Sequence, residues 1–150
     1  AVKGVIQARM LRSSMLVVTT NIEGGPKPES SMEVTSEEGA ARQREVIREI
    51  CDAIWSLEAA HNLRWLFITD DDAYLASDDW RRHLLWQLFC RFDVGRDLHF
   101  DEGGGRVAWD ATAPIPSNKG PIPVRRWPGV TIHDPEVAER VDAWLAEGGY

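Results

Sequence analysis

The sequence predicts an α/β fold in which helices pack on a mixed sheet, within a single domain covering residues 1–150. Three observations support this prediction. Residues 63–69 form an apolar run that ends in acids and leads into an amphipathic helix, the order typical of a strand feeding a crossover helix. Residues 15–20 are rich in β-branched side chains, as strands are. The whole chain then alternates as strand, strand, helix, strand, helix, strand, strand, tail and helix.

The first half of the chain predicts two strands and a long helix. Residues 2–9 are expected to form an edge strand, and residues 14–20 a buried strand. Residues 22–35 contain Gly-Gly-Pro and are expected to form a long loop. Thr35 and Glu38 have the spacing of a capping box, so a helix is expected to begin there and to end near residues 60–62. Its apolar stripe comprises Ile47, Ile50, Ile54 and Leu57.

The second half predicts a central strand, a helix, a hairpin and a tail. Residues 65–69 are apolar on both faces, which is typical of a strand covered by helices on both sides. The helix expected over 77–92 has an apolar face of Leu84, Leu85, Leu88, Phe89 and Phe92, and a polar face of Arg81, Arg82 and Gln87.

Beyond that helix, residues 98–100 and 106–110 are expected to pair through a glycine turn at 103–105. Residues 113–133 hold five of the eight prolines and are expected to form a wrapping segment. The last helix covers 134–147 and begins with Asp-Pro. Its apolar face comprises Val137, Val141, Trp144 and Leu145.

The amino-acid composition indicates which classes of partner this chain is expected to bind. The net charge of −7 argues against nucleic acid, which binds a basic face. No apolar run approaches the roughly 18–20 residues that a membrane helix needs, and the first residues lack a signal-peptide pattern, so a cytoplasmic location is expected. Cys51 and Cys90 fall in predicted helices and are expected to be buried, reduced thiols.

The acids Asp70, Asp71 and Asp72 follow the predicted central strand. Ligands of α/β sheets collect at that edge, and two nearby carboxylates can hold Mg²⁺ or Mn²⁺. A metal-dependent transferase using Asp70 and Asp72 is therefore one hypothesis. The structural alternative is that these acids terminate the strand and solvate the turn.

Other residue types do not assemble into a recognisable site. The histidines, His61, His83, His99 and His133, are dispersed, and none has metal-motif spacing with another ligand. No serine lies in a GxSxG nucleophile elbow. The glycines at 103–105 join two strands, and no helix opens after them to bind phosphate.

Six short motifs occur in one order along the chain. They are residues 17–19 (VVT), 68–72 (ITDDD), 86–91 (WQLFCR), 93–97 (DVGRD), 110–112 (DAT) and 134–144, which begins with Asp-Pro. This set resembles the C-terminal domain of the UbiD family of carboxy-lyases, and it covers most of the chain. The family-signature residues are Asp70, Asp71, Asp72, Arg96, Asp97, Asp110 and Thr112.

The resemblance implies a role in a (de)carboxylase acting on aromatic or α,β-unsaturated acids. In the family, prenylated FMN, a divalent metal and the catalytic acids belong mainly to a separate N-terminal domain. The C-terminal domain closes over the cofactor and builds the oligomer. The resemblance therefore implies a larger UbiD-like catalytic subunit as partner, in a hetero-oligomer that also self-associates, with cofactor and metal on that partner chain and no catalytic residue in this one.

Two departures from the family pattern concern the cofactor and the substrate pocket. Family members carry lysines directly after the VV[ST] strand, and one of them can reach the cofactor phosphate, whereas this chain has Asn21 there. Between Asp97 and Asp110 family members have a longer loop that helps line the substrate pocket, whereas the connection in this chain is short and glycine-rich. Among the other residues, Trp86 and Arg91 are expected either at an inter-subunit surface or in core packing and a surface ion pair. Trp127 is expected to anchor on a partner or to plug this domain's own core.

Three hypotheses follow for the function. The first is the small subunit of a split UbiD-like (de)carboxylase, which supplies the lid and oligomerisation domain. The second is a non-catalytic scaffold or regulatory subunit of such a complex, favoured by the missing lysine and the short connection. The third is the metal-dependent transferase.

Overall fold

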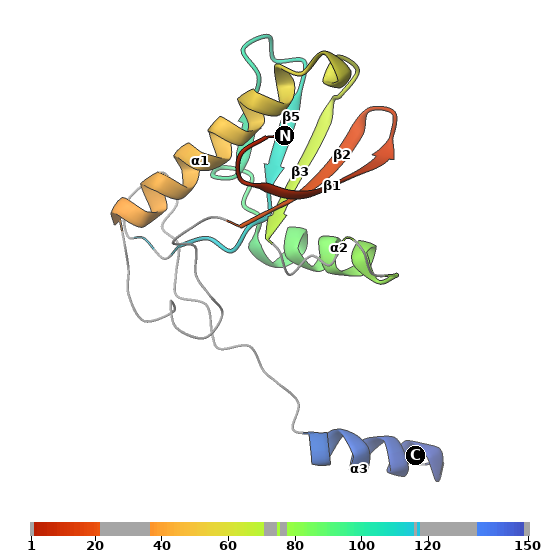
Figure 1. The fold of residues 1–150 in the computed structure, drawn as a ribbon. Helices are drawn as coiled ribbons and strands as arrows, with labels where there is room; N and C mark the ends of the chain where they lie inside the picture. The colour runs from red at the N-terminus through yellow and green to blue at the C-terminus, as the bar shows by residue number, and fades with distance from the viewer. Residues whose placement is uncertain are drawn as a thin grey trace.

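Five strands form one mixed sheet in the order β1-β2-β3-β5-β4 (Figure 1). The computed structural model describes residues 2–21, 37–70, 75, 78–115, 117 and 135–148. The strands are β1 (Val5–Arg12), β2 (Met15–Thr20), β3 (Trp65–Asp70), β4 (Leu98–Phe100) and β5 (Val107–Asp110). The two edge strands run antiparallel to their neighbours, and β2, β3 and β5 run parallel. The carboxyl ends of the three parallel strands therefore meet at one edge of the sheet.

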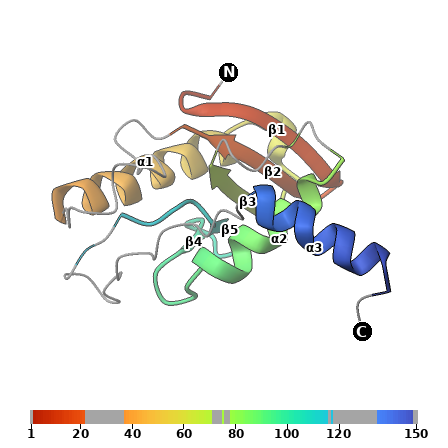
Figure 2. The same cartoon turned by 90° about the horizontal axis from the view of Figure 1, so that it is seen from below.

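Two helices lie on opposite faces of this sheet, and a third lies apart from it. They are α1 (Glu37–Trp55), α2 (Trp80–Arg91) and α3 (Pro135–Ala146), and a short 3-10 helix, η1 (Glu58–Ala60), follows α1. In Figure 2 α3 overlaps α2, but Figure 1 shows that α3 lies well away from the sheet.

The alternation of side chains along the strands gives each helix its own core. On the α1 face, Val18 and Ile68 pack with Ile47 and Ile50 of the helix, and all four are fully buried or nearly so. On the opposite face, Val17 packs with the buried residues of α2. Neighbouring positions of β2 thus face different helices, which is the pattern that a two-sided α/β sheet requires.

The predicted α/β fold is confirmed, and the second, third and hairpin strands lie where the sequence places them. The first strand is displaced, because it runs from Val5 to Arg12 instead of over residues 2–9. The first helix ends earlier than expected, at Trp55, and the short η1 follows over Glu58–Ala60. Both differences concern ends of elements, where propensity is a weak guide.

The predicted faces of α2 are partly wrong. Leu85 and Phe89 point to solvent, with Phe89 86% exposed, whereas Gln87 is fully buried. Cys90 is also exposed, so the expectation of two buried thiols holds only for Cys51. The sequence of α2 is apolar on more than one side, and spacing alone therefore did not identify which side meets the sheet.

Several expectations lie outside the described residues. They concern the loop at 22–35, the cap at Thr35, the acids Asp71 and Asp72, and most of the segment at 113–133 with Trp127. The last helix begins at Pro135, as expected. None of the helices in the described part of the chain is both long and apolar enough to cross a membrane.

Candidate functional site at the carboxyl edge of the sheet

The sequence-predicted site residues gather where the parallel strands end. Strand β3 ends at Asp70 and β5 ends at Asp110, and these strands are neighbours in the sheet. Thr20, the last residue of β2, pairs with Asp70. Since ligands of open α/β sheets bind outside the carboxyl ends of the strands, this edge is the first place to search for a site.

Asp70 ties three elements together. Its Oδ2 accepts a hydrogen bond from Arg91 Nη1 at 2.8 Å, and the two side chains form an ion pair that is 12% exposed for Arg91 and 27% for Asp70. Both carboxylate oxygens also accept from the backbone N–H of Ala113, at 3.2 and 3.0 Å. The carboxylate thereby joins β3, the end of α2 and the segment after β5.

The turn after α2 continues this network. Arg96 donates to the carbonyl oxygen of Arg91 at 2.7 Å and to both carboxylate oxygens of Asp97, at 2.5 and 2.6 Å. Asp97 also accepts from the Asp93 N–H at 2.7 Å. The carbonyl oxygen of Asp97 in turn accepts from the Asp110 N–H at 2.9 Å. The DVGRD motif is therefore a self-bonded turn that links α2 to β5.

Asp110 is buried at the end of β5. One of its oxygens accepts from the backbone N–H of Thr112 at 2.9 Å and from the Thr112 hydroxyl at 2.7 Å. Burial raises the pKa of the Asp110 carboxyl to about 7, and the Thr112 hydrogen bonds oppose this while the Asp97 and Asp70 carboxylates add to it. The DAT motif is thus a closed turn around a carboxyl that holds its proton more readily than usual.

Gln43 is a member of this network that the sequence reasoning missed. From the buried side of α1, its Nε2 donates to the Thr112 hydroxyl at 3.1 Å and to the Ala113 carbonyl at 2.8 Å, and its Oε1 accepts from the Ile115 N–H at 3.0 Å. The signal was present in the sequence, because Gln43 lies four residues before Ile47 on the apolar stripe. A polar residue on such a stripe needs a buried partner.

The described signature residues are therefore bonded to one another. Asp70 and Asp97 each accept from an arginine and from a backbone amide. Asp110 accepts from Thr112, whose hydroxyl accepts from Gln43. Within the residues that the structure describes, no three His, Cys, Asp or Glu side chains are grouped as metal ligands. An arginine on Asp70 is also the wrong neighbour for a cation. These contacts give Asp70, Asp97 and Asp110 a structural role at this edge, and Asp72, the second acid of the metal hypothesis, lies outside the described residues.

The remaining predicted site residues lie around this network. Asn21 follows β2 directly, is exposed, and so borders the same edge. Trp86 is about half exposed on the outer side of α2, and the Arg91 guanidinium lies 5.3 Å from the centre of its ring. Arg91 thus bridges the predicted interface residue and the Asp70 carboxylate.

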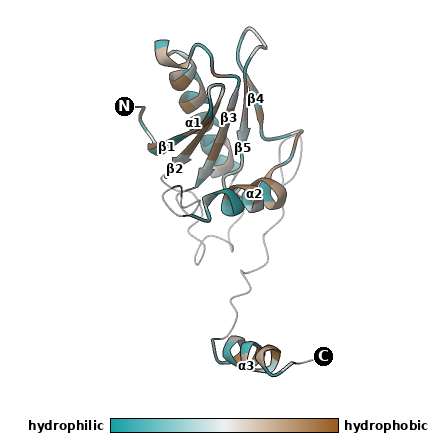
Figure 3. Cartoon of the chain, turned by 90° about the vertical axis from the view of Figure 1, so that its right-hand side faces the viewer, coloured by the Kyte–Doolittle hydropathy of each residue, from teal (hydrophilic) through white to brown (hydrophobic). Residues whose placement is uncertain are grey.

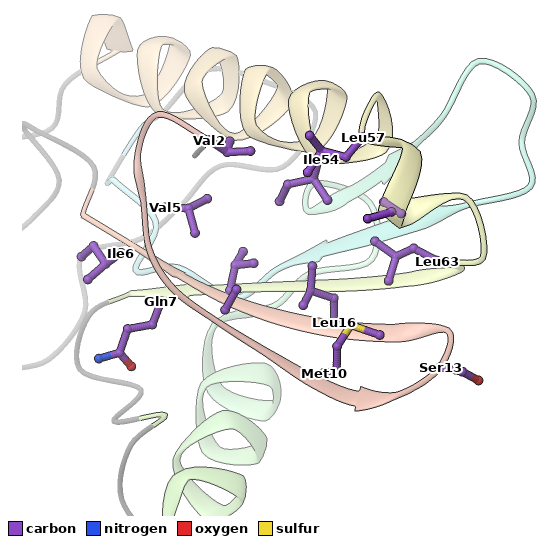
Figure 4. A pocket seen from close by; sticks show the side chains of 14 residues that line it. Val2, Val5, Ile6, Gln7, Met10, Ser13, Leu16, Ile54, Leu57 and Leu63 are labelled. Atoms are coloured by element: carbon purple, nitrogen blue, oxygen red, sulfur yellow. The ribbon is translucent and has the colours of Figure 1, made fainter.

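A separate apolar pocket lies on the α1 face, between β1 and the end of α1 (Figure 4). Its volume is about 400 Å³, and buried side chains of Val18, Ile54 and Leu63 are among those lining it. The fourteen lining residues include no charged side chain. The pocket can accept an apolar group, and its described lining offers no charged side chain for catalysis.

The fold is similar to part of a known decarboxylase, the vanillic acid decarboxylase ShVdcCD of Sedimentibacter hydroxybenzoicus. Its closed form matches with a TM-score of 0.53 and 13% identity, over 96% of this chain and 28% of that chain. The open form with truncated ShVdcD matches with a TM-score of 0.52 and 13% identity, over 96% and 29%.

A third structure is an evolved dimeric form of the UbiD-class enzyme HmfF from Pelotomaculum thermopropionicum in complex with prFMN. It matches at a TM-score of 0.48 and 16% identity, over 91% of this chain and 26% of that chain. No family model matches the sequence. No curated protein is similar to it in sequence.

The comparison confirms the predicted resemblance to UbiD-class carboxy-lyases at the level of the fold. This chain spans less than a third of the length of the decarboxylase chains that it matches. At 13% identity the likeness concerns the fold, and the activity of the larger proteins comes to this chain only as a proposal.

Proposed function

We propose that this chain is the small subunit of a split UbiD-like (de)carboxylase that acts on an aromatic or α,β-unsaturated acid. A larger UbiD-like partner chain carries prenylated FMN, a divalent metal and the catalytic acids. This chain supplies the module that closes over the cofactor and contributes to the oligomer.

The observation that carries this proposal is the internal bonding of the signature. A domain that performed the chemistry itself would direct some of its acids and bases toward a ligand. Here Asp70, Asp97 and Asp110 hold the ends of β3, α2 and β5 together. The described signature residues thus shape the carboxyl edge, which supports the proposal that the reacting groups belong to the partner chain.

We assign this carboxyl edge of the sheet to the surface that faces the cofactor of the partner chain. Asn21 is exposed next to it and takes the position of the family lysine. An amide can donate a hydrogen bond to a phosphate but carries no charge, so its contribution to cofactor binding is smaller than that of a lysine. The main affinity for the cofactor therefore belongs to the partner chain.

The test is reconstitution with a larger UbiD-like chain loaded with prenylated FMN. Release of CO₂ from a panel of aromatic and α,β-unsaturated acids is measured with and without this chain. We expect a stable complex and a turnover number that falls at least tenfold when this chain is omitted. A stable chain that neither binds the larger subunit nor changes its turnover would refute the proposal.

A scaffold or regulatory role is the second candidate, and the loss of the lysine at Asn21 favours it. The same reconstitution separates the two roles. A complex that forms but turns over at an unchanged rate without this chain supports the scaffold. Asn21→Lys then serves as a gain-of-function variant. In a closing module, the restored cation should lower the Kd of this chain for the cofactor-loaded partner. A scaffold should not respond to this substitution.

A further inference from the structure

Strand β1 forms one edge of the sheet, and β4 forms the other (Figure 3). Among the described residues β1 pairs with β2 alone, so the backbone groups on its outer side have no strand beside them. The pairing with β2 is regular over residues 7–10, between register shifts at Val5/Gln7 and Met10/Arg12. Such an edge can pair with an extended segment of another chain, and its short regular length means that side chains must add to the affinity.

The two faces of β1 carry different side chains. Met10 pairs with Leu16, which packs in the core under α1, so Met10 lies on the α1 face. Arg9 pairs with Val17, which packs against α2, so Arg9 lies on the α2 face. A strand added beside β1 would repeat this alternation, because side chains on one face are neighbours across paired strands.

The α1 face of this edge is apolar and open to solvent. The pocket of about 400 Å³ lies directly beside β1, and Figure 4 shows Ile6 and Met10 of β1 and Leu57 after α1 around it. These three side chains are 47%, 54% and 48% exposed. No charged side chain belongs to the lining. The residues that an added strand places on this face would therefore have to be apolar.

The α2 face of the edge is positively charged. The exposed Arg9 guanidinium lies 4.7 Å from the centre of the Trp80 ring and donates to the Leu75 carbonyl oxygen at 2.6 Å. Arg81 lies at the same distance from the same ring. In the described part of the chain neither arginine forms an ion pair with an acid. Since opposite charges stabilise neighbouring strands, an added strand should present acids here.

A peptide strand of a different sequence is the occupant that satisfies both features. A small apolar molecule would fill the pocket but leave the backbone edge of β1 unpaired. A second copy of β1 is disfavoured, because this strand contains two arginines and no acid, and pairing it with itself would bring like charges together. The partner strand thus carries acids where β1 carries arginines.

We propose that β1 binds an extended segment of the larger partner chain as an added strand. Apolar residues of that segment enter the pocket beside Met10 and alternate with acids that face Arg9. Backbone hydrogen bonds supply affinity, and the pocket and the arginine supply specificity. This inference deepens the proposed function, on which it rests only for the source of the strand.

The first experiment measures binding of a fluorescent peptide to the purified chain by anisotropy. The probe is a peptide of about nine residues in which valine and glutamate alternate, long enough to cover β1. One control peptide has lysine in place of glutamate, and the other groups the same residues so that the alternation is lost. We expect at least threefold weaker binding of the lysine peptide and at least tenfold weaker binding of the grouped peptide. Equal binding of all three, or no saturable binding of the probe at about 1 mM, overturns the inference.

Surface variants then locate the bound peptide. Met10→Glu should weaken its binding at least tenfold, because it places a charge at the apolar pocket. Phe100→Glu is the matched control, since Phe100 is 63% exposed on β4, at the opposite edge of the sheet. It should change the affinity less than threefold. Ile6→Glu replaces Met10→Glu if circular dichroism shows that the latter folds poorly. Equal weakening by the variant and its control contradicts the site.

Hydrogen exchange distinguishes an added strand from a ligand that only fills the pocket. The bound peptide should slow exchange at amides of β1 and leave those of β4 unchanged, because only a paired strand accepts from the outer β1 amides. Unchanged exchange in β1 at saturating peptide would contradict strand addition.

Reconstitution tests the source of the strand. Met10→Glu should weaken binding of this chain to the larger UbiD-like subunit at least tenfold, and Phe100→Glu less than threefold. Unchanged affinity of Met10→Glu removes the larger chain as the source, while the proposed function stands. A larger subunit that does not bind the wild-type chain refutes the proposed function, whereas the peptide experiments still decide the strand site.

Discussion

The guanidinium of Arg91 and the carboxylate of Asp70 form a 2.8 Å ion pair that fixes the end of α2 to the end of β3. The two residues lie 21 positions apart in the chain, and most of α2 separates them. Few side chains of α2 are buried, namely Trp80, Leu84 and Gln87. The ion pair therefore acts together with the packing of Leu88 and the stack of Phe92 on Trp109 to hold the C-terminal end of this helix on the sheet.

Arg91→Ala is expected to destabilise the fold by about 2 kcal/mol, because it leaves the partly buried Asp70 carboxylate with a missing charged partner. Urea denaturation followed by circular dichroism measures the change. The matched control is Arg42→Ala, which removes an ion pair that is more than half exposed and should cost about 0–1 kcal/mol. Equal effects of the two substitutions would show that the Arg91 pair has no special role.

The free energy of unfolding should vary with pH in the way that the raised pKa of Asp110 predicts. Its folded pKa of about 7 lies above the ordinary value of 3.8, so the folded state binds more protons than the unfolded state between those pH values. Stability from this group is present below pH 4 and is lost as the pH rises toward 7, with a slope of up to about 1.4 kcal/mol per pH unit.

Asp110→Asn isolates that contribution, since asparagine keeps an oxygen that can accept from Thr112 but does not titrate. Between pH 4 and pH 7 the variant should become more stable relative to the wild type. Above pH 7 the difference between their unfolding free energies should stay constant. His99, whose pKa is lowered by burial, acts with the opposite sign in both proteins and cancels in the difference. A difference that does not vary with pH would contradict the buried, proton-holding carboxyl.

Gln43→Ala should release the segment after β5 from α1. The substitution removes three hydrogen bonds and leaves the Ile115 N–H without its acceptor. We expect the free energy of unfolding to fall by about 2–3 kcal/mol. Hydrogen exchange at the Ile115 amide should be faster in the variant than in the wild type, and the increase should exceed that at amides of β2. Exchange at Ile115 that stays unchanged in the variant would mean that other contacts hold this segment.

The two cysteines should differ sharply in reactivity. Cys90 is exposed on α2, whereas Cys51 is fully buried and burial raises its pKa. A thiol reagent such as DTNB should modify one thiol within minutes and the second only on unfolding in denaturant. Cys90→Ser should abolish the fast phase and Cys51→Ser should leave it. Two fast thiols in the native wild type would contradict the burial of Cys51 on α1, and the absence of any fast thiol would contradict the orientation of α2.

The strands were predictable because their patterns are local. The β-branched run of β2 and the apolar run of β3 each specify a strand, and the acids mark where β3 ends. The side of α2 that meets the sheet was not predictable in the same way. Leu84 and Leu85 are neighbours in sequence, yet one is buried and the other is exposed, and only packing against Val17 decides between them.

The candidate site was predictable in its residues but not in its chemistry. The six motifs identified Asp70, Asp97, Asp110 and Thr112, and the structure brings them to one edge of the sheet. Their bonding partners come from distant parts of the chain, above all Gln43, which lies 69 positions before Thr112. A sequence pattern identifies such residues without showing that they satisfy one another.

In the proposed function, this chain shapes and closes a site whose reacting groups belong to a larger chain. The most direct test is native mass spectrometry of this chain mixed with prenylated FMN, first alone and then with a UbiD-like catalytic subunit. We expect no cofactor adduct on the isolated chain, and a ternary species that contains both chains and one cofactor per catalytic subunit. Stoichiometric binding of the cofactor by the isolated chain, together with CO₂ release from an acid substrate, would contradict the account.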